Sequence, residues 1–255
     1  MSPLAATTKI VLITGANQGL GFAIAKSLSS KPGYHVLMGS RNTQRGIEAA
    51  SKLQQQGLAV EALDIDVTSD ESIAKATSVV SSKFGRLDVL INNAGVAIDE
   101  EGSPGSKGKP PLAGSKLRTV YQDTFAVNTF GAAVTTEAFT SLLSLSSAPR
   151  IVFMSSILGS LAYRSAAAID GAAALPIYRS SKAALNMIVL HYASKYKDAG
   201  WKINACCPGY CATNLNSFAG FDSPETGAIN AVRLAMLGED GETGTYSNKE
   251  GVIPW

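Results

Sequence analysis

Runs of apolar residues alternate with amphipathic runs along most of the chain. Short stretches such as Ile10–Ile13 and Val89–Ile91 are apolar at every position, which is typical of strands covered on both faces. The pattern predicts strands at Lys9–Thr14, Tyr34–Gly39, Leu58–Leu63, Leu87–Ile91, Arg150–Met154, Lys202–Cys206 and, least distinctly, Gly244–Ser247. It predicts helices at Leu20–Ser30, Thr43–Gln56, Ser69–Phe84, Lys116–Leu145, Ile177–Tyr196 and Pro224–Leu237.

The regular alternation of strand and helix predicts an α/β fold. A parallel sheet with helices on both faces, doubly wound and Rossmann-like, accommodates such an order in a single domain spanning residues 1–255. Helix starts support the boundaries, because Ser69 can cap one helix and Ser223-Pro224-Glu225 supplies a cap, a first-turn proline and a first-turn acid for another.

Two segments interrupt the alternation. Asp99–Gly114 is rich in Gly, Ser, Pro and Lys and predicts a long surface loop, and Leu158–Pro176 is rich in alanine. Both follow the carboxyl ends of predicted strands, where open α/β sheets bind their ligands. We therefore expect substrate loops near 96–114, 157–177 and 211–225.

Composition narrows the class of protein. The chain has 255 residues, of which 45% are hydrophobic and 16% charged, and its formal net charge is +2. That balance gives no special attraction to nucleic acid or acidic membranes. No apolar run reaches the roughly 18–20 residues of a membrane span, and Met1–Thr8 lacks the layout of a secretory signal. We expect a cytoplasmic protein without nucleic-acid or membrane partners.

Three cysteines, Cys206, Cys207 and Cys211, crowd into a short segment. Three is an odd number for disulfides, and adjacent cysteines rarely pair with each other. A metal site is conceivable, but only His35 and His191 are available as further soft ligands. We favour reduced, partly buried thiols and no metal.

A glycine-rich turn follows the first predicted strand. Its sequence, Thr14-Gly15-Ala16-Asn17-Gln18-Gly19-Leu20-Gly21, opens a helix with the spacing GxxxGxG. Glycines let backbone N–H groups approach a pyrophosphate, and the helix N-terminus adds partial positive charge. The spacing differs from the usual dinucleotide fingerprint, GxGxxG, so the turn by itself is only suggestive of nucleotide binding.

The end of the second strand bears on the choice of cofactor. A site selective for NAD places an acid there to hold the ribose hydroxyls, whereas a 2′-phosphate calls for an arginine. This strand ends in Ser40-Arg41 and has no acid. Arg41 can grip a phosphate and Ser40 can add a hydroxyl donor, so we expect NADP(H) rather than NAD(H).

Tyr178 and Lys182 lie four residues apart in a predicted helix, which places them on one face. If the head groups were about 4 Å apart at an effective dielectric near 20, the phenolate would be favoured by roughly 4 kcal/mol. The pKa of the phenol would then fall about three units from its usual value of about 10. Such a group could serve as a general acid or base near neutral pH.

The glycine turn, Asn92-Asn93-Ala94-Gly95, Ser156, Tyr178 and Lys182 together resemble the short-chain dehydrogenase/reductase family over essentially the whole chain. The resemblance implies a catalytic set of Asn128, Ser156, Tyr178 and Lys182. It also assigns Asp66-Val67 to the adenine, with Asp64 as the competing register. The cofactor contacts that turn, strand ends and resemblance predict are Gly15, Asn17, Gln18, Gly19, Leu20, Gly21, Ser40, Arg41, Asp66, Val67, Asn93, Ala94, Gly95, Tyr178, Lys182, Pro208, Gly209, Cys211 and Thr213.

Within the family, the Cys206-Cys207-Pro208-Gly209 segment and the terminal tryptophan look most like NADPH-dependent carbonyl reductases. The resemblance implies reduction of a ketone or aldehyde, with Tyr178 as proton donor to a small-molecule substrate. A β-ketoacyl thioester reductase and a non-catalytic NADP(H)-binding sensor or scaffold are the alternatives. The stretch between Ser156 and Tyr178 is shorter than the insertion of the monomeric carbonyl reductases, so we expect a homodimer or homotetramer.

Overall fold

The computed structural model describes residues 7–99, 112–166 and 174–255. In this part of the chain an eight-stranded sheet has the order β3-β2-β1-β4-β5-β6-β7-β8. Strands β1 to β7 run parallel, and β8 pairs antiparallel with β7. The strands are β1 (Lys9–Ile13), β2 (Tyr34–Ser40), β3 (Val60–Asp64), β4 (Val89–Asn92), β5 (Arg150–Met154), β6 (Lys202–Cys206), β7 (Tyr246–Asn248) and β8 (Gly251–Val252).

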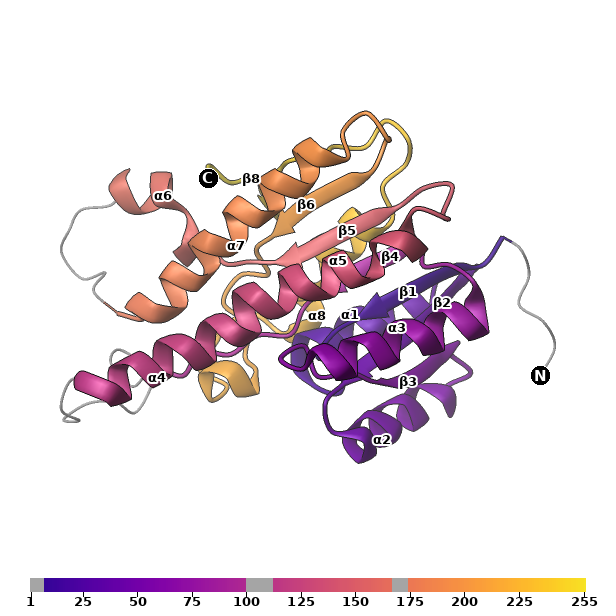
Figure 1. Ribbon diagram of the computed structural model, residues 1–255, viewed down its shortest axis with the longest axis horizontal. Coiled ribbons are helices and arrows are strands. Elements are labelled where there is room, and N and C mark those ends of the chain that lie inside the picture. Colours follow the sequence, from indigo (N-terminus) through magenta and orange to yellow (C-terminus); the bar gives the residue numbers. More distant parts are fainter. Residues whose placement is uncertain (1–6, 100–111, 167–173) are drawn as a thin grey trace.

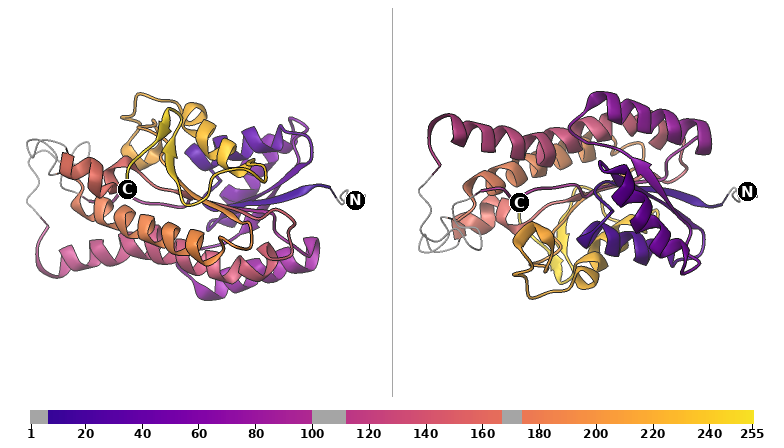
Figure 2. Two further views of the ribbon diagram at one scale, coloured as in Figure 1. Left: turned by 90° about the horizontal axis from the view of Figure 1, so that it is seen from above. Right: turned by 90° about the horizontal axis from the view of Figure 1, so that it is seen from below.

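Helices cover both faces of the sheet (Figures 1 and 2). One layer consists of α1 (Gly19–Ser29), α2 (Thr43–Gln54) and α8 (Pro224–Ala235). The other consists of α3 (Asp70–Phe84), α5 (Ala132–Leu143) and α7 (Pro176–Lys195), and α4 (Gly114–Phe125) packs beside α7. A short helix, α6 (Leu161–Ala166), follows β5.

Strand β1 shows how the apolar runs build two cores. Leu12 packs into the core beneath α3, α5 and α7, while Val11 and Ile13 pack into the core beneath α1, α2 and α8. Successive side chains of a strand point to opposite faces, so a strand between two helical layers must be apolar throughout. The predicted doubly wound parallel sheet is confirmed. The antiparallel strand β8 and the short helix α6 were not predicted.

The predicted helix Lys116–Leu145 is interrupted. A π-helical segment, η1 (Ala126–Gly131), joins α4 to α5. Close packing accompanies it: a Cβ on Gly131 would lie 2.8 Å from the carbonyl oxygen of Val67, so only glycine lets the helix approach the loop after β3. Segments of π-helix are frequent at functional sites, and this one carries Asn128.

Two helix caps predicted from sequence are present. The Ser69 side chain accepts a hydrogen bond from the backbone N–H of Ser72, and Ser223 accepts one from Thr226. These bonds satisfy backbone donors that the first helical turn leaves without a partner. Both helices therefore begin where the residue pattern placed them.

The three cysteines are buried thiols without disulfide bonds. Burial raises the pKa of each of them, and that of Cys211 reaches about 11. Among the residues that the structure describes, no helix combines the length and apolarity needed to cross a membrane.

Candidate active site

A cavity of ≈ 840 Å³ opens at the carboxyl ends of the parallel strands. Its walls come from the turns and loops after β1 to β6 and from the first turns of α7. It brings together almost all residues predicted for the site, which are Gly15, Asn17, Gln18, Gly19, Leu20, Gly21, Arg41, Asp66, Val67, Asn93, Ala94, Gly95, Ser156, Tyr178, Lys182, Pro208, Gly209, Cys211 and Thr213. Ser40 and Asn128 are the predicted residues that do not line it.

The glycine turn forms one end of the cavity. Gly15 and Gly19 have φ values of +65° and +55°, a region that favours glycine, and a Cβ on Gly21 would lie 2.5 Å from the Gly15 carbonyl oxygen. Asn93 fixes the turn, because its side-chain amide donates to the carbonyls of Thr14 at 2.8 Å and Gly15 at 3.1 Å. The turn is therefore held from the loop after β4.

The start of α1 fits an anionic ligand. Its N-cap residue, Gln18, makes no side-chain capping bond, and the first turn contains no acid. The first N–H groups of a helix have no intrahelical partner and carry partial positive charge. The residues present at this turn thus fit the pyrophosphate of a dinucleotide.

The residues after β2 and β3 can be compared with the cofactor contacts predicted there. Asp66 and Val67 line the cavity and Asp64 does not, which favours the Asp66 register. Arg41 lines the cavity and is exposed. Ser40 corrects the sequence expectation: it is 2% exposed, and its hydroxyl donates to the carbonyl oxygen of Asn42 at 2.9 Å. The Ser40 hydroxyl is thus committed to the turn before α2.

Ser156, Tyr178 and Lys182 form the other end of the cavity. Ser156 follows β5 and caps a short 3-10 turn, while Tyr178 and Lys182 lie on successive turns of α7. The Lys182 ammonium donates to the Met154 carbonyl oxygen at 2.8 Å and lies 5.7 Å from the centroid of the Tyr178 ring. A phenol, a hydroxyl and an ammonium thus share one wall.

The expected acidic phenol is absent from this arrangement. Burial raises the pKa of Tyr178 to about 12, and a hydrogen bond with Ser156 offsets only part of that rise. Burial also lowers the pKa of Lys182 to about 8. The prediction of a phenol titrating near 7 is therefore wrong for this structure, because burial disfavours the phenolate and Lys182 is not among the groups that lower the pKa of Tyr178. A phenol that stays protonated at neutral pH can donate a proton.

Asn128 lies behind the wall. It is buried, and its amide oxygen accepts from the N–H of Val96 while its nitrogen donates to the Val96 carbonyl, both at 2.8 Å. The Cβ position of Gly95 is 3.4 Å from the Asn128 oxygen and 3.7 Å from the Lys182 nitrogen. Asn128 therefore holds the loop after β4 next to the lysine.

Comparison with known proteins identifies the family. The family model described as short chain dehydrogenase matches residues 9–220, which contain the glycine turn and the wall formed by Ser156, Tyr178 and Lys182. The chain belongs to the short-chain dehydrogenase/reductase family. Its members are oxidoreductases that bind nicotinamide cofactors and act on small molecules.

Individual relatives agree with that assignment. A short-chain dehydrogenase/reductase of Stachybotrys chlorohalonatus is 40% identical over 96% of this chain and 89% of its own length. The (−)-isopiperitenone reductase of Mentha piperita is 31% identical over 98% of this chain and 99% of its own. The solved structure of salutaridine reductase from Papaver somniferum has a TM-score of 0.77 at 27% identity and covers 92% of this chain and 98% of that one.

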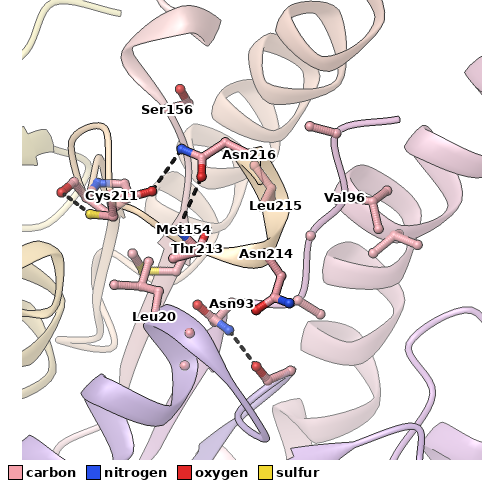
Figure 3. A pocket seen from close by; sticks show the side chains of 18 of the residues that line it. Leu20, Asn93, Val96, Met154, Ser156, Cys211, Thr213, Asn214, Leu215 and Asn216 are labelled. Atoms are coloured by element: carbon pink, nitrogen blue, oxygen red, sulfur yellow. Dashed lines mark hydrogen bonds between the residues drawn. The ribbon is translucent and has the colours of Figure 1, made fainter. Parts of the chain in front are cut away.

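In the segment after β6, the site of this short-chain dehydrogenase/reductase includes residues beyond the predicted Pro208, Gly209, Cys211 and Thr213. In Figure 3, Asn216 bonds to Cys211 and Thr213, which closes the segment after β6 on itself. The cavity residues not predicted individually are Ile65, Val96, Ala97, Ile98, Val127, Met154, Ser155, Leu158, Leu175, Tyr210, Asn214, Leu215 and Asn216. Most lie in the predicted substrate loops, whose residues 100–111 and 167–173 are outside the described part of the chain.

The place of Asp99 is a further correction. Sequence composition assigned it to a surface loop, but it is 2% exposed and accepts hydrogen bonds from the backbone of Ile177 and Tyr178. The remainder of the predicted loop, up to 111, is outside the described residues. No local sequence signal connects Asp99 to a helix that begins so much later in the chain.

Proposed function

We propose that this protein reduces a ketone or aldehyde carbonyl to an alcohol with NADPH, and that Tyr178 is the proton donor. The observation that carries the proposal is the single cavity that joins the glycine turn and Arg41 to a wall formed by Ser156, Tyr178 and Lys182. A dinucleotide laid along the strand ends would extend from the first group of residues to the second.

The residues have distinct roles in this proposal. The bound NADPH supplies the hydride. Ser156 donates a hydrogen bond to the carbonyl oxygen and stabilises the negative charge that develops there. Tyr178, protonated at neutral pH, gives its proton to the same oxygen. Lys182 holds cofactor hydroxyls beside the phenol, and Asn128 keeps the adjoining loop in place.

The substrate end of the cavity supports a carbonyl compound with an apolar body. Val96, Ile98, Leu158, Leu175 and Leu215 contribute apolar side chains there. The names of the Mentha and Papaver relatives describe reductases. Members of the family are often oligomeric, and the homodimer or homotetramer expected from the resemblance stays a prediction.

The test is an assay of NADPH consumption over a panel of ketones, aldehydes, quinones and a β-ketoacyl thioester. Turnover of free ketones or aldehydes supports the proposal. Turnover of the thioester alone would favour the β-ketoacyl reductase. Tight binding of NADPH without turnover of any panel member would favour the sensor or scaffold.

The dependence of kcat/KM on pH is expected to reflect the loss of the Lys182 ammonium proton. With saturating carbonyl substrate, kcat/KM for NADPH should fall as pH rises above about 8, because the ammonium loses its proton there. The phenol keeps its proton up to about 12 and should contribute nothing to this limb. Initial rates from pH 6 to pH 10 measure the profile, with thermal unfolding at each pH as the control. An activity that rises through pH 8 would contradict the assignment.

Replacing Arg41 should change cofactor preference. Arg41→Ala is expected to weaken NADPH binding about 10- to 150-fold and leave NADH binding nearly unchanged, because a charge-assisted contact of about 1.5–3 kcal/mol to the 2′-phosphate is lost. Fluorescence titration with each reduced cofactor gives both affinities directly.

The control for this substitution is Arg118→Ala, since Arg118 is also exposed but lies on α4 and does not line the cavity. It should leave both affinities unchanged. If Arg41→Ala weakens the two cofactors equally, or if the wild type binds them equally well, Arg41 is not the phosphate contact.

A further inference from the structure

The N-cap residue of α7 provides no side-chain cap for the helix. Leu175 occupies the N-cap position with φ 61° and ψ 48° and has no side-chain acceptor, and Pro176 at the next position has no N–H to satisfy. The N–H of Arg179 donates to the Leu175 carbonyl oxygen at 2.9 Å. Two donors of the first turn, those of Ile177 and Tyr178, therefore need an acceptor from elsewhere.

Asp99 supplies that acceptor from the loop after β4. The N–H of Ile177 donates to one carboxylate oxygen at 2.7 Å, and the N–H of Tyr178 donates to both oxygens at 3.2 and 3.1 Å. The Asp99 side chain is buried, where a carboxylate needs strong hydrogen bonds and gains from the positive end of a helix. The carboxylate thus holds the backbone of Tyr178 itself.

The loop that carries Asp99 also connects to the remainder of the site. Asn93 bonds to the glycine turn, and Val96 is held on both its N–H and its carbonyl by Asn128. Ile98 lines the cavity, but Asp99 does not. Asp99 therefore contacts the start of α7 and not the cavity, and its charge also contributes to the raised pKa of the Tyr178 phenol.

We propose that Asp99 is a positioning residue. From the loop after β4 it caps the first turn of α7 and thereby fixes the position of the Tyr178 phenol next to Ser156. The inference rests on the proposed function in that it takes Tyr178 as the proton donor. Without the carboxylate, two buried N–H groups lose their acceptors and the first turn of α7 is free to shift or fray. A misplacement of about 1 Å at a reacting group can cost on the order of 100-fold in rate.

Three substitutions test the proposal kinetically. Asp99→Ala should lower kcat by about 10- to 100-fold, with the affinity for NADPH little changed, because the shift affects proton donation more than cofactor binding. Asp99→Asn keeps one acceptor oxygen and should fall between wild type and Asp99→Ala. Asp99→Glu should restore part of the lost kcat because it returns both acceptors and the charge. Asp99→Ala turnover within twofold of wild type would overturn the proposal.

A double substitution separates positioning from a general structural defect. If Asp99 acts through the phenol, adding Asp99→Ala to Tyr178→Phe should lower the residual rate no further. Losses that multiply would instead assign Asp99 a role independent of Tyr178 and overturn the proposal.

Asp88 offers a matched control. It is as deeply buried as Asp99 and also accepts a backbone hydrogen bond, from Ile10 at 2.8 Å, but it precedes β4 and so lies at the far end of the sheet from the cavity. Asp88→Asn should lower the unfolding temperature and leave kcat of the folded enzyme unchanged. If Asp88→Asn lowers kcat as much as Asp99→Asn does, loss of any buried carboxylate has this effect, and the proposal would fail.

Amide hydrogen exchange tests whether Asp99 caps α7, and it does not depend on enzyme activity. In Asp99→Ala, the amides of Ile177 and Tyr178 should exchange faster while those in the second half of α7 keep their protection. Unchanged protection at both amides would overturn the proposal. If the wild-type enzyme reduces no carbonyl compound, the proposed function fails, whereas selective loss of protection would still establish the Asp99 cap.

Discussion

Tyr178→Phe is expected to lower carbonyl turnover by about 100- to 10,000-fold, the range that general acid catalysis contributes. The substitution removes the phenol oxygen and its proton but keeps the ring, which packs at the start of α7 with 9% of the residue exposed. Because the lost group is a proton donor, binding of NADPH should remain largely intact. Single-turnover rates and fluorescence titration of NADPH measure the two effects separately.

The matched control is Tyr192→Phe. Tyr192 is also a buried tyrosine of α7, but its hydroxyl bonds to Glu137 on α5 at 3.0 Å, away from the cavity. Turnover should be unchanged in this variant. A Tyr178→Phe enzyme that keeps more than about a tenth of wild-type turnover would rule out the proposed role.

Ser156→Ala should reduce kcat by about 100- to 1,000-fold, because it removes one donor to the oxygen on which negative charge develops. The side chain lines the cavity and hydrogen-bonds with Tyr178, so its loss also removes the interaction that partly offsets the raised pKa of the phenol. Initial rates with a ketone identified from the panel measure the effect, and cofactor titration checks that NADPH still binds.

Ser180→Ala is the control for this prediction. Its hydroxyl donates to the Ile177 carbonyl oxygen at 3.0 Å, and the residue does not line the cavity. It should retain wild-type turnover. If Ser156→Ala does so as well, the hydroxyl is not a donor to the reacting oxygen.

Much of the fold was predictable from local patterns. Strands such as β1 are apolar on both faces, and this feature distinguishes a parallel sheet between two helical layers. Glycines at Gly15, Gly19 and Gly21 marked the turn that the backbone makes there. Caps at Ser69 and Ser223 are local bonds between residues three apart, so the sequence shows both partners together.

The interruption of the long helix after β4 was harder to predict from the sequence. Its π-helical turn lies where Gly131 approaches Val67, which belongs to the loop after β3, so the neighbour of this turn is distant in the sequence. Helical spacing predicted a helix here but not its π-helical turn.

The sequence by itself determined the doubly wound architecture and the glycine turn, because these follow from periodicity and glycine geometry. Its motifs, through their resemblance to the family, also gave the catalytic set and most of the predicted cofactor contacts. Only the tertiary structure decided three features: the protonation state of Tyr178, the hydrogen bond that occupies the Ser40 hydroxyl, and the position of Asp99 at the start of α7. The pKa of a phenol depends on how completely distant elements bury it, and here burial raises it to about 12. The Asp99 carboxylate caps a helix 78 positions further along the chain, a contact that the sheet creates by bringing the ends of β4 and β5 together.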